Sequence, residues 1–176
     1  TAAKAVGNNT IALGTKSKAI ADNSIAQGAN ATANKESDIA IGTNSVANGS
    51  EGVCNKDGKG SSSLPPGSSA SNCEGSAVAL GKNANATGTF AVAVGVSANA
   101  TNKNTTALGS GANATIENAV ALGSNSATSK FEPTNSATVG GHTYGGFAGA
   151  TSGLGNGAVV SVGTAGNERQ IQNVAA

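Results

Sequence analysis

Hydrophobic and polar positions follow one short phrase that returns along this chain at a fixed interval. Between residues 75 and 128 the phrase reads Ala-Val-Ala-Leu-Gly with small changes, and it ends at Gly81, Gly95, Gly109 and Gly123. These glycines are fourteen residues apart, and the same phrase ends earlier at Gly14, Gly28 and Gly42. A fixed short period predicts a solenoid, in which each repeat is one coil that buries its apolar side by stacking on its neighbours.

Within each coil the apolar residues occupy fixed places. Alanine stands two residues before every repeat glycine, at Ala12, Ala26, Ala40, Ala79, Ala93, Ala107 and Ala121. Branched apolar residues flank it in most coils, namely Ile11, Leu13, Ile25, Ile39, Ile41, Val78, Leu80, Val92, Val94, Leu108, Val120 and Leu122. Such alternation, rich in β-branched types and bounded by Gly and Asn, predicts strand, turn, strand, turn in each coil. The expected fold class is therefore all-β.

The alternation also bears on assembly, because successive side chains of a strand point to opposite faces. A coil of fourteen residues encloses a narrow space that suits alanine. We therefore expect the alanines to point into the coil and the branched residues to pack against other copies of the chain. Left uncovered, the branched residues would form an apolar stripe of roughly several hundred Å², which is large for a monomer. The opposite arrangement, with branched residues inside and alanine facing water, stays open at this point.

An insertion interrupts the repeats between Gly42 and Gly81, which are 39 residues apart, or fourteen plus 25. Residues 51–75 account for the excess, and their Gly, Ser, Asn, Lys and Pro content predicts a loop without strands. The two cysteines, Cys54 and Cys73, stand near its ends. They predict a disulfide that ties the neck of the loop, worth about 3 kcal/mol, and an oxidising, extracytoplasmic setting.

The rhythm loosens after residue 128. Residues 129–158 predict an irregular insertion or cap, and residues 159–163 predict one more strand. Asn167 with Gln170 has the pattern of a helix capping box, ahead of Ile171 and Val174 at helical spacing. We expect a helix to begin here, with the two apolar residues on a coiled-coil seam.

Composition narrows the function classes. Aromatic residues make up 2% of the chain, Trp and Met are absent and Gly numbers 26, so a conventional core of large side chains is excluded. The net charge is +1 with a single Arg, which provides no basic stripe for nucleic acid. No apolar run approaches the roughly 20 residues that span a bilayer. The first residues also lack a signal-peptide pattern.

Residues that carry chemistry are sparse. The nine acidic residues do not recur at one coil position, so neither paired catalytic carboxylates nor a calcium ladder is predicted. His142 stands in a glycine-rich span without a Cys, an Asp or a second His near it in sequence. We expect no enzymatic activity, no metal site and no cofactor.

Two stretches carry a family resemblance. The phrase from Ser76 to Gly88, Ser-Ala-Val-Ala-Leu-Gly-Lys-Asn-Ala-Asn-Ala-Thr-Gly, resembles the head repeats of trimeric autotransporter adhesins of the YadA type. Residues 159–176 resemble the neck that joins such a head to a coiled-coil stalk. The neck residues under this resemblance are Val160, Val162, Arg169, Ile171 and Val174. The implied organisation is a head at 1–128 carrying the insert at 51–75, an insertion or cap at 129–158, and a neck at 159–176.

The resemblance implies a left-handed parallel β-roll in each chain of a homotrimer, displayed on a bacterial surface. Its membrane contact would come only through a C-terminal outer-membrane anchor, which this segment does not contain. The implied function is non-catalytic, multivalent attachment to host matrix proteins such as collagen, fibronectin or laminin, or to a host cell receptor. Which of these is the ligand does not follow from the residues.

Three other functions are alternatives to adhesion: a structural spacer, ice binding and sugar-acting catalysis. A purely structural solenoid spacer fits the regular repeats. An ice-binding solenoid would need one unbroken rank of Thr, yet the position four before each repeat glycine reads Thr10, Ser24, Asp38, Ala77, Ala91, Thr105 and Ala119. A β-helical enzyme acting on sugars would need clustered carboxylates or basic residues, which one Arg and one His do not supply.

Overall fold

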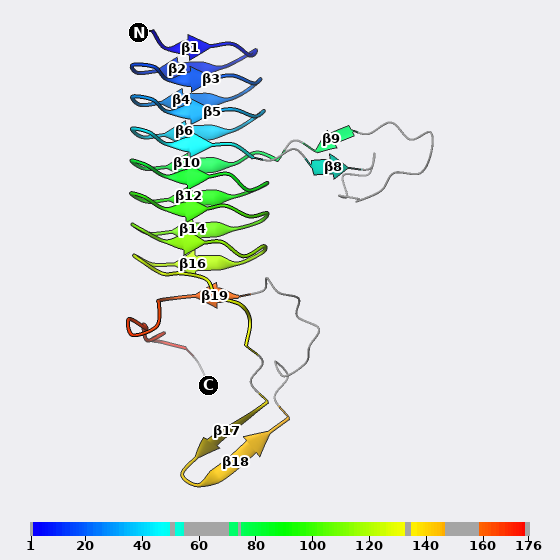
Figure 1. Ribbon diagram of the computed structural model, residues 1–176, viewed down its shortest axis with the longest axis vertical. Coiled ribbons are helices and arrows are strands. Elements are labelled where there is room, and N and C mark those ends of the chain that lie inside the picture. The colour runs from blue at the N-terminus through cyan, green and yellow to red at the C-terminus, as the bar shows by residue number, and fades with distance from the viewer. Residues whose placement is uncertain are drawn as a thin grey trace.

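The computed structural model describes residues 2–49, 52–54, 71–73, 75–132, 135–146 and 159–174. Over these residues the chain is all-β and builds a column of stacked coils (Figure 1). Parallel pairing joins residues fourteen apart, such as Val78 with Val92, so each coil lies directly on the one before it. The predicted fold class, a parallel β-solenoid of fourteen-residue coils, is confirmed.

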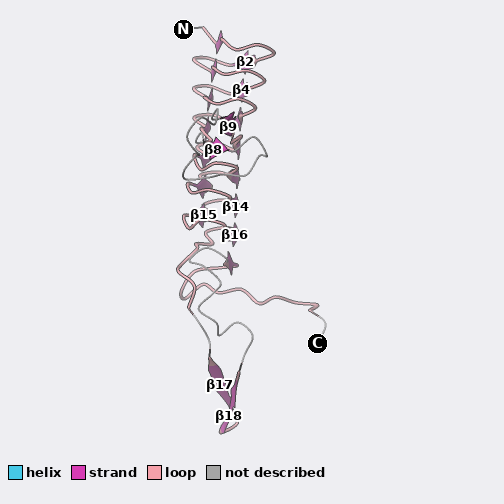
Figure 2. Ribbon diagram, turned by 90° about the vertical axis from the view of Figure 1, so that its right-hand side faces the viewer, coloured by secondary structure: helices cyan, strands magenta, loops and turns pink. Residues whose placement is uncertain are grey.

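Each coil contributes one short strand to each of two parallel sheets. Sheet A holds the two-residue strands β1 (Lys4–Ala5), β3 (Lys18–Ala19), β5 (Thr32–Ala33), β7 (Val46–Ala47), β11 (Asn85–Ala86), β13 (Asn99–Ala100) and β15 (Asn113–Ala114). Sheet B holds β2 (Ile11–Leu13), β4 (Ile25–Gln27), β6 (Ile39–Ile41), β10 (Val78–Leu80), β12 (Val92–Val94), β14 (Thr106–Leu108), β16 (Val120–Leu122) and β19 (Val160–Ser161). With the strands viewed nearly end-on, Figure 2 shows the two sheets on opposite sides of the coil.

Two tight turns per coil connect the sheets. At the last position of most turns stands an Asn with a left-handed backbone, such as Asn30 at φ 57° and Asn104 at φ 56°. Asn tolerates this conformation better than most residues, which explains why it recurs there. In the turn that follows each strand of sheet B, the first residue is the repeat glycine, and it lies against the next coil. A Cβ on Gly28 would stand 2.6 Å from the backbone of Gly42, so no side chain fits.

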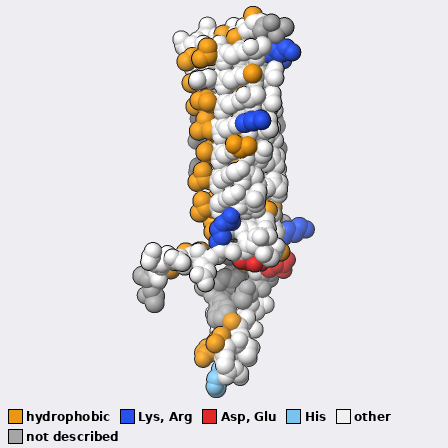
Figure 3. Space-filling view, turned by 90° about the vertical axis from the view of Figure 1, so that its left-hand side faces the viewer, with side chains coloured by type: hydrophobic (Ala, Val, Ile, Leu, Met, Phe, Trp, Pro, Cys, Tyr) orange, Lys and Arg blue, Asp and Glu red, His pale blue; other side chains and the backbone are white. Residues whose placement is uncertain are grey.

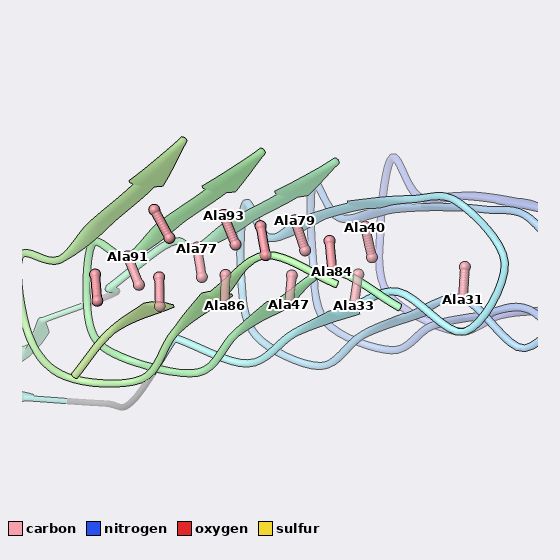
Figure 4. Packing of buried hydrophobic residues seen from close by; sticks show 14 of the residues in the cluster. Ala31, Ala33, Ala40, Ala47, Ala77, Ala79, Ala84, Ala86, Ala91 and Ala93 are labelled. Atoms are coloured by element: carbon pink, nitrogen blue, oxygen red, sulfur yellow. The ribbon is translucent and has the colours of Figure 1, made fainter. Parts of the chain in front are cut away.

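The interior of the column is filled by alanine and small polar residues. Eighteen alanines with no exposed surface form one cluster along the column, and Figure 4 shows their methyl groups pointing between the two sheets. Interior hydroxyl groups turn back to the backbone. Ser17 Oγ donates to the carbonyl of Gly14 at 2.9 Å, and Ser24 Oγ donates to that of Ala21 at 2.6 Å. Among the described residues, the buried side-chain polar atoms of the coil all have hydrogen-bond partners.

The insert leaves the column sideways without breaking it. Strand β6 pairs directly with β10, with Ile39 opposite Val78, although 39 residues separate them. Between them β8 (Gly52–Cys54) and β9 (Ser71–Cys73) form an antiparallel pair that projects from the side of the column (Figure 1). The prediction of a loop without strands was wrong for these six residues. The first and last parts of the insert lie next to each other where they leave the column. Pairing of β8 with β9 therefore satisfies backbone hydrogen-bonding groups of both segments.

Below the column the chain departs from the coil pattern. Strands β17 (Ser136–Val139) and β18 (His142–Gly145) form an antiparallel hairpin, and only Ala137 in it is half-buried. The expected packed cap is therefore not formed by this hairpin. The chain then returns to sheet B, where β19 pairs with β16.

The helix predicted from Asn167 onward was wrong for the residues that the structure describes there. Asn167 donates its N–H to the carbonyl of Thr164 at 2.8 Å and closes a turn, and residues 165–174 run on as exposed chain. A helix this short is marginal unless its apolar side is packed against another element, and Ile171 and Val174 are left exposed by the described part of the chain. No helix of the described residues is long and apolar enough to cross a membrane.

Candidate functional site

The outer face of sheet B carries two parallel columns of side chains. In-register pairing stacks the residues that precede the central alanine of each strand. They are Ile11, Ile25, Ile39, Val78, Val92, Thr106 and Val120. It likewise stacks those that follow it, Leu13, Gln27, Ile41, Leu80, Val94, Leu108 and Leu122. Twelve of the fourteen are Ile, Leu or Val. Figure 3 shows hydrophobic side chains gathered in a stripe along one side of the column.

Stacking covers these side chains only in part. Ile39, Val78 and Leu80 are half-buried, whereas Leu13 is 60% exposed and Leu108 is 44% exposed. The remaining members that the sequence singled out, Ile25, Ile41, Val92, Val94 and Val120, are half-buried, and Ile11 and Leu122 are exposed. One chain alone therefore presents a long apolar stripe to solvent, which is the kind of surface that marks an interaction site.

The central alanines face the other way. Ala26, Ala40, Ala79, Ala93, Ala107 and Ala121 have no exposed surface. Ala12, in the first complete coil, is partly buried and packs against the same cluster. The open alternative, in which branched residues fill the coil and alanine faces water, does not occur. The position four before each repeat glycine, where an ice-binding surface would need Thr, also faces the interior of the coil. Ser24, Asp38 and Thr105 at this position are fully buried.

The outer face of sheet A is polar, in contrast to sheet B. Its strands present Lys4, Lys18, Thr32, Val46, Asn85, Asn99 and Asn113 in one row. The three asparagines form an amide chain, in which Asn85 Nδ2 donates to Asn99 Oδ1 at 2.9 Å and Asn99 Nδ2 donates to Asn113 Oδ1 at 2.7 Å. The column therefore has one apolar face and one hydrogen-bonding face.

A buried carboxylate at the root of the insert was not identified from the sequence. Asp38 has no exposed surface, and its Oδ1 accepts a hydrogen bond from Ala77 N at 2.7 Å while its Oδ2 accepts one from Lys35 N at 2.9 Å. Burial raises the pKa of Asp38, and hydrogen bonds from backbone groups, including that of Gly49, partly offset this effect. The sequence did contain a signal, because Asp38 is an acidic residue at an interior coil position in the last coil phrase before the insert.

The predicted disulfide falls partly outside the described structure. Strand pairing sets Cys54 opposite Ser71 and Cys73 opposite Gly52, so the cysteines lie on neighbouring strands with their positions offset by two residues. Their side chains are outside the described residues. The disulfide stays a prediction.

The neck residues meet the last coil through one side chain. Arg169 Nη1 donates to Ser126 Oγ at 3.0 Å and to the carbonyl of Val162 at 2.8 Å, and its Nη2 donates to the carbonyl of Ser124 at 2.5 Å. Val160 lies exposed on β19, and the side chains of Ile171 and Val174 are 70% and 69% exposed. Arg169 thus covers backbone at the end of the column, whereas the two apolar neck residues have no contact partner within the described chain that buries them.

The described residues offer no cluster of side chains for metal binding or acid–base catalysis. No three His, Cys, Asp or Glu side chains there lie close enough to hold a metal ion. His142 is exposed on the hairpin strand β18. What the column offers is extended surface: an apolar stripe on one side and a regular polar face on the other.

Both the sequence and the fold of this chain are similar to those of known proteins. A family model described as the YadA head domain repeat (two copies) matches residues 1–17, 5–31, 19–45, 33–53, 75–98 and 100–126. The chain belongs to the YadA head family. The matched residues cover the coils on both sides of the insert, and the resemblance to the heads of trimeric autotransporter adhesins is confirmed.

A solved structure shares the fold of this YadA-like head. The crystal structure of the collagen-binding domain of the Yersinia adhesin YadA aligns with a TM-score of 0.57 and 25% sequence identity, over 99% of this chain and 76% of that chain. No curated protein sequence is significantly similar to the chain. Heads of the YadA family are adhesive modules rather than catalysts, which agrees with the surface described above.

Proposed function

We propose that this YadA-like head works as a homotrimer on the bacterial surface and attaches the cell to host extracellular matrix, with collagen as the first candidate ligand. The observation that carries the proposal is the pair of apolar columns on sheet B. A second and a third copy of the chain, arranged around a three-fold axis, cover the stripe of each chain with the stripes of the other two. An apolar surface of this length is then removed from water.

The same arrangement turns sheet A outward in all three copies. Its row of Lys, Thr and Asn side chains, interrupted by Val46, offers hydrogen-bond donors and acceptors along the column. Three such faces on one particle allow weak contacts to act together through effective concentration. Collagen is named because the structurally similar domain is a collagen-binding domain.

The proposal also includes the boundaries of the units. Residues 1–128 form the head, with residues 51–75 as its insert, residues 129–158 lie between head and neck, and residues 159–176 form the neck that leads to an outer-membrane-anchored stalk. Fibronectin, laminin and a host cell receptor are the competing ligands. A catalytic role is not proposed.

Binding of the purified head to immobilised triple-helical collagen, gelatin, fibronectin and laminin tests the ligand. A variant with Val92→Asp and Val94→Asp puts charge on sheet B, and Thr32→Asp puts a similar charge on sheet A as the matched control. We expect the wild-type head to bind collagen, the sheet B variant to lose at least about a hundredfold in apparent affinity, and the control to stay assembled. An assembled wild-type head that binds none of the four proteins would overturn the proposed ligand class.

A further inference from the structure

Phe90 occupies a turn position that small polar residues fill in the other coils. It is the last residue of the turn that leads into β12, has a left-handed backbone with φ 58° and is 49% exposed. The equivalent residues in the other described coils are Asn9, Asn23, Ser37, Ser76, Asn104 and Asn118. A bulky residue at positive φ is strained by about 1–3 kcal/mol, and such strain persists where it serves a purpose.

Val96 breaks the polar pattern of the opposite turn in the same coil. It follows Gly95, directly after β12, and is 50% exposed. The equivalent residues elsewhere are Thr15, Ala29, Thr43, Lys82, Ser110 and Ser124, none of which is a large apolar residue. Phe90 and Val96 therefore stand at the two ends of one strand of sheet B, on opposite edges of the column. Over the described coils, no other turn carries an exposed large hydrophobic side chain at either position.

Three-fold symmetry brings these two edges together. In a closed ring of parallel copies, each contact is heterologous, so one edge of each copy meets the opposite edge of the next. A three-fold rotation has no translation along its axis, so residues at the same level of the column meet. Because sheet B faces the axis in the proposed trimer, its strand ends lie at the corners between neighbouring copies.

We propose that Phe90 of one copy packs against Val96 of the next copy, forming an apolar latch at each of the three corners. The proposal rests on the homotrimer proposed above and adds the contact that closes it. Both members of the latch come from the coil that follows the insert, and each replaces a residue type that would stay in water at this position. The exposed ring and the exposed isopropyl group then cover each other.

The latch also sets the register between copies. The apolar columns of sheet B repeat at every coil, so a copy that slides by one coil, about 4.8 Å, keeps most of its apolar contacts. A contact that occurs in a single coil removes this degeneracy, as a feature that specifies register does in other repetitive assemblies. The backbone strain at Phe90 is then compensated between chains rather than within one chain.

Disulfide trapping tests the latch. In a background with Cys54→Ser and Cys73→Ser, we compare Phe90→Cys alone, Val96→Cys alone and both together under mild oxidation. The two residues of one copy flank the three-residue strand β12 at its opposite ends, which sets them beyond disulfide reach of each other. The proposal predicts a covalent trimer on a non-reducing gel for the double variant alone. Phe90→Cys with Ser124→Cys, two coils out of level, is the matched control and should stay uncross-linked.

Sedimentation of the same samples separates the possible failures. A double variant that sediments as a trimer without cross-linking overturns the latch and leaves the proposed assembly intact. A wild-type head that sediments as a monomer overturns the assembly and the latch with it. Cross-linking of the out-of-level control as readily as the double variant also contradicts the latch.

A second variant keeps the proposal testable if the cysteine variants do not fold. Phe90→Asn introduces asparagine, which adopts the left-handed backbone at the equivalent position of other coils, such as Asn104. If Phe90 merely faces water, this change relieves strain and raises Tm. The latch predicts the opposite sign, a Tm lowered by several degrees together with weaker association, while Asn104→Ser at the equivalent position of the next coil should shift Tm less. A higher Tm for Phe90→Asn, with association unchanged, overturns the latch.

Discussion

The carboxylate of Asp38 accepts a 2.7 Å hydrogen bond from the backbone N–H of Ala77, across the whole insert. In an uninterrupted coil the N–H at this position donates to a carbonyl three residues earlier, as Ala91 N does to Gly88 O at 3.1 Å. For Ala77 the side chain of Asp38, from the preceding coil, is an acceptor. This buried hydrogen bond therefore joins the coil before the insert to the coil after it, where β6 pairs with β10.

Replacing Asp38 with Ala should destabilise the head. The change removes the Asp38 acceptors of the backbone N–H groups of Ala77 and Lys35, which we expect to cost about 1–3 kcal/mol. Chemical denaturation followed by circular dichroism measures the loss. Ser24→Ala is the matched control, because Ser24 occupies the same coil position but bonds only the carbonyl of its own turn, and alanine already stands there in other coils. Equal losses for the two variants would show that Asp38 has no special role.

Asp38 should also give the head a distinctive pH dependence. Burial raises the pKa of Asp38 above its ordinary value of 3.8, so the folded chain holds this proton more tightly than the unfolded chain. Its contribution to stability is therefore fully present below the ordinary value and is lost as pH rises through the folded pKa.

The comparison of wild type with Asp38→Asn isolates this contribution. Asp22, whose pKa is lowered by hydrogen bonds from Asn8, acts in the opposite sense in both proteins and cancels in the difference. Free energies of unfolding measured from about pH 3 to about pH 7 should fall more steeply, or rise less, in the wild type than in the variant. Parallel curves for the two proteins would rule the explanation out.

Removal of residues 51–75 should leave the column folded. Strand β6 already pairs with β10, and the shortened sequence reads Gly-Ser-Ser-Ala at the junction, the same length as the turn from Gly88 to Ala91. We expect one cooperative thermal transition with a Tm within a few degrees of the wild type. Broad or non-cooperative unfolding of the shortened chain would show that the insert is part of the folding unit.

The amide chain on sheet A should stabilise the coils in proportion to its bonds. Asn99 both accepts from Asn85 and donates to Asn113, so Asn99→Ala removes two hydrogen bonds, whereas Asn85→Ala removes one. At about 0.5–1.5 kcal/mol for each bond, the loss for Asn99 should be roughly twice that for Asn85. Denaturation midpoints compare the two variants, and equal effects would mean that the chain of amides adds nothing beyond packing.

The sequence predicted the repetitive part of the molecule because each coil obeys the same local rules. The alternation around Ala79 placed a strand at residues 78–80, and the narrow coil correctly set alanine inside and the branched residues outside. A period repeated seven times averages out the ambiguity of any single short strand. Recognition of the family followed from the same repetition.

The features that occur once were harder to predict. The hairpins at residues 52–54 with 71–73 and at 136–145 depend on pairing between segments with weak strand patterns. The capping-box pattern at Asn167 indicated a helix, but a local signal does not hold a short helix whose apolar residues, Ile171 and Val174, stay exposed. In the sequence Asp38 is one member of a row of coil positions, and its hydrogen bond with Ala77 depends on the return of the chain to the column after the insert.

In the proposed homotrimer, the apolar columns of sheet B are covered by further copies of the same chain. Sedimentation equilibrium of the purified head at micromolar concentration tests it most directly. The account predicts the mass of three chains, each of 16.6 kDa, and dissociation when Val92 and Val94 are both replaced by Asp. A wild-type head that sediments as a single folded chain at that concentration would contradict it.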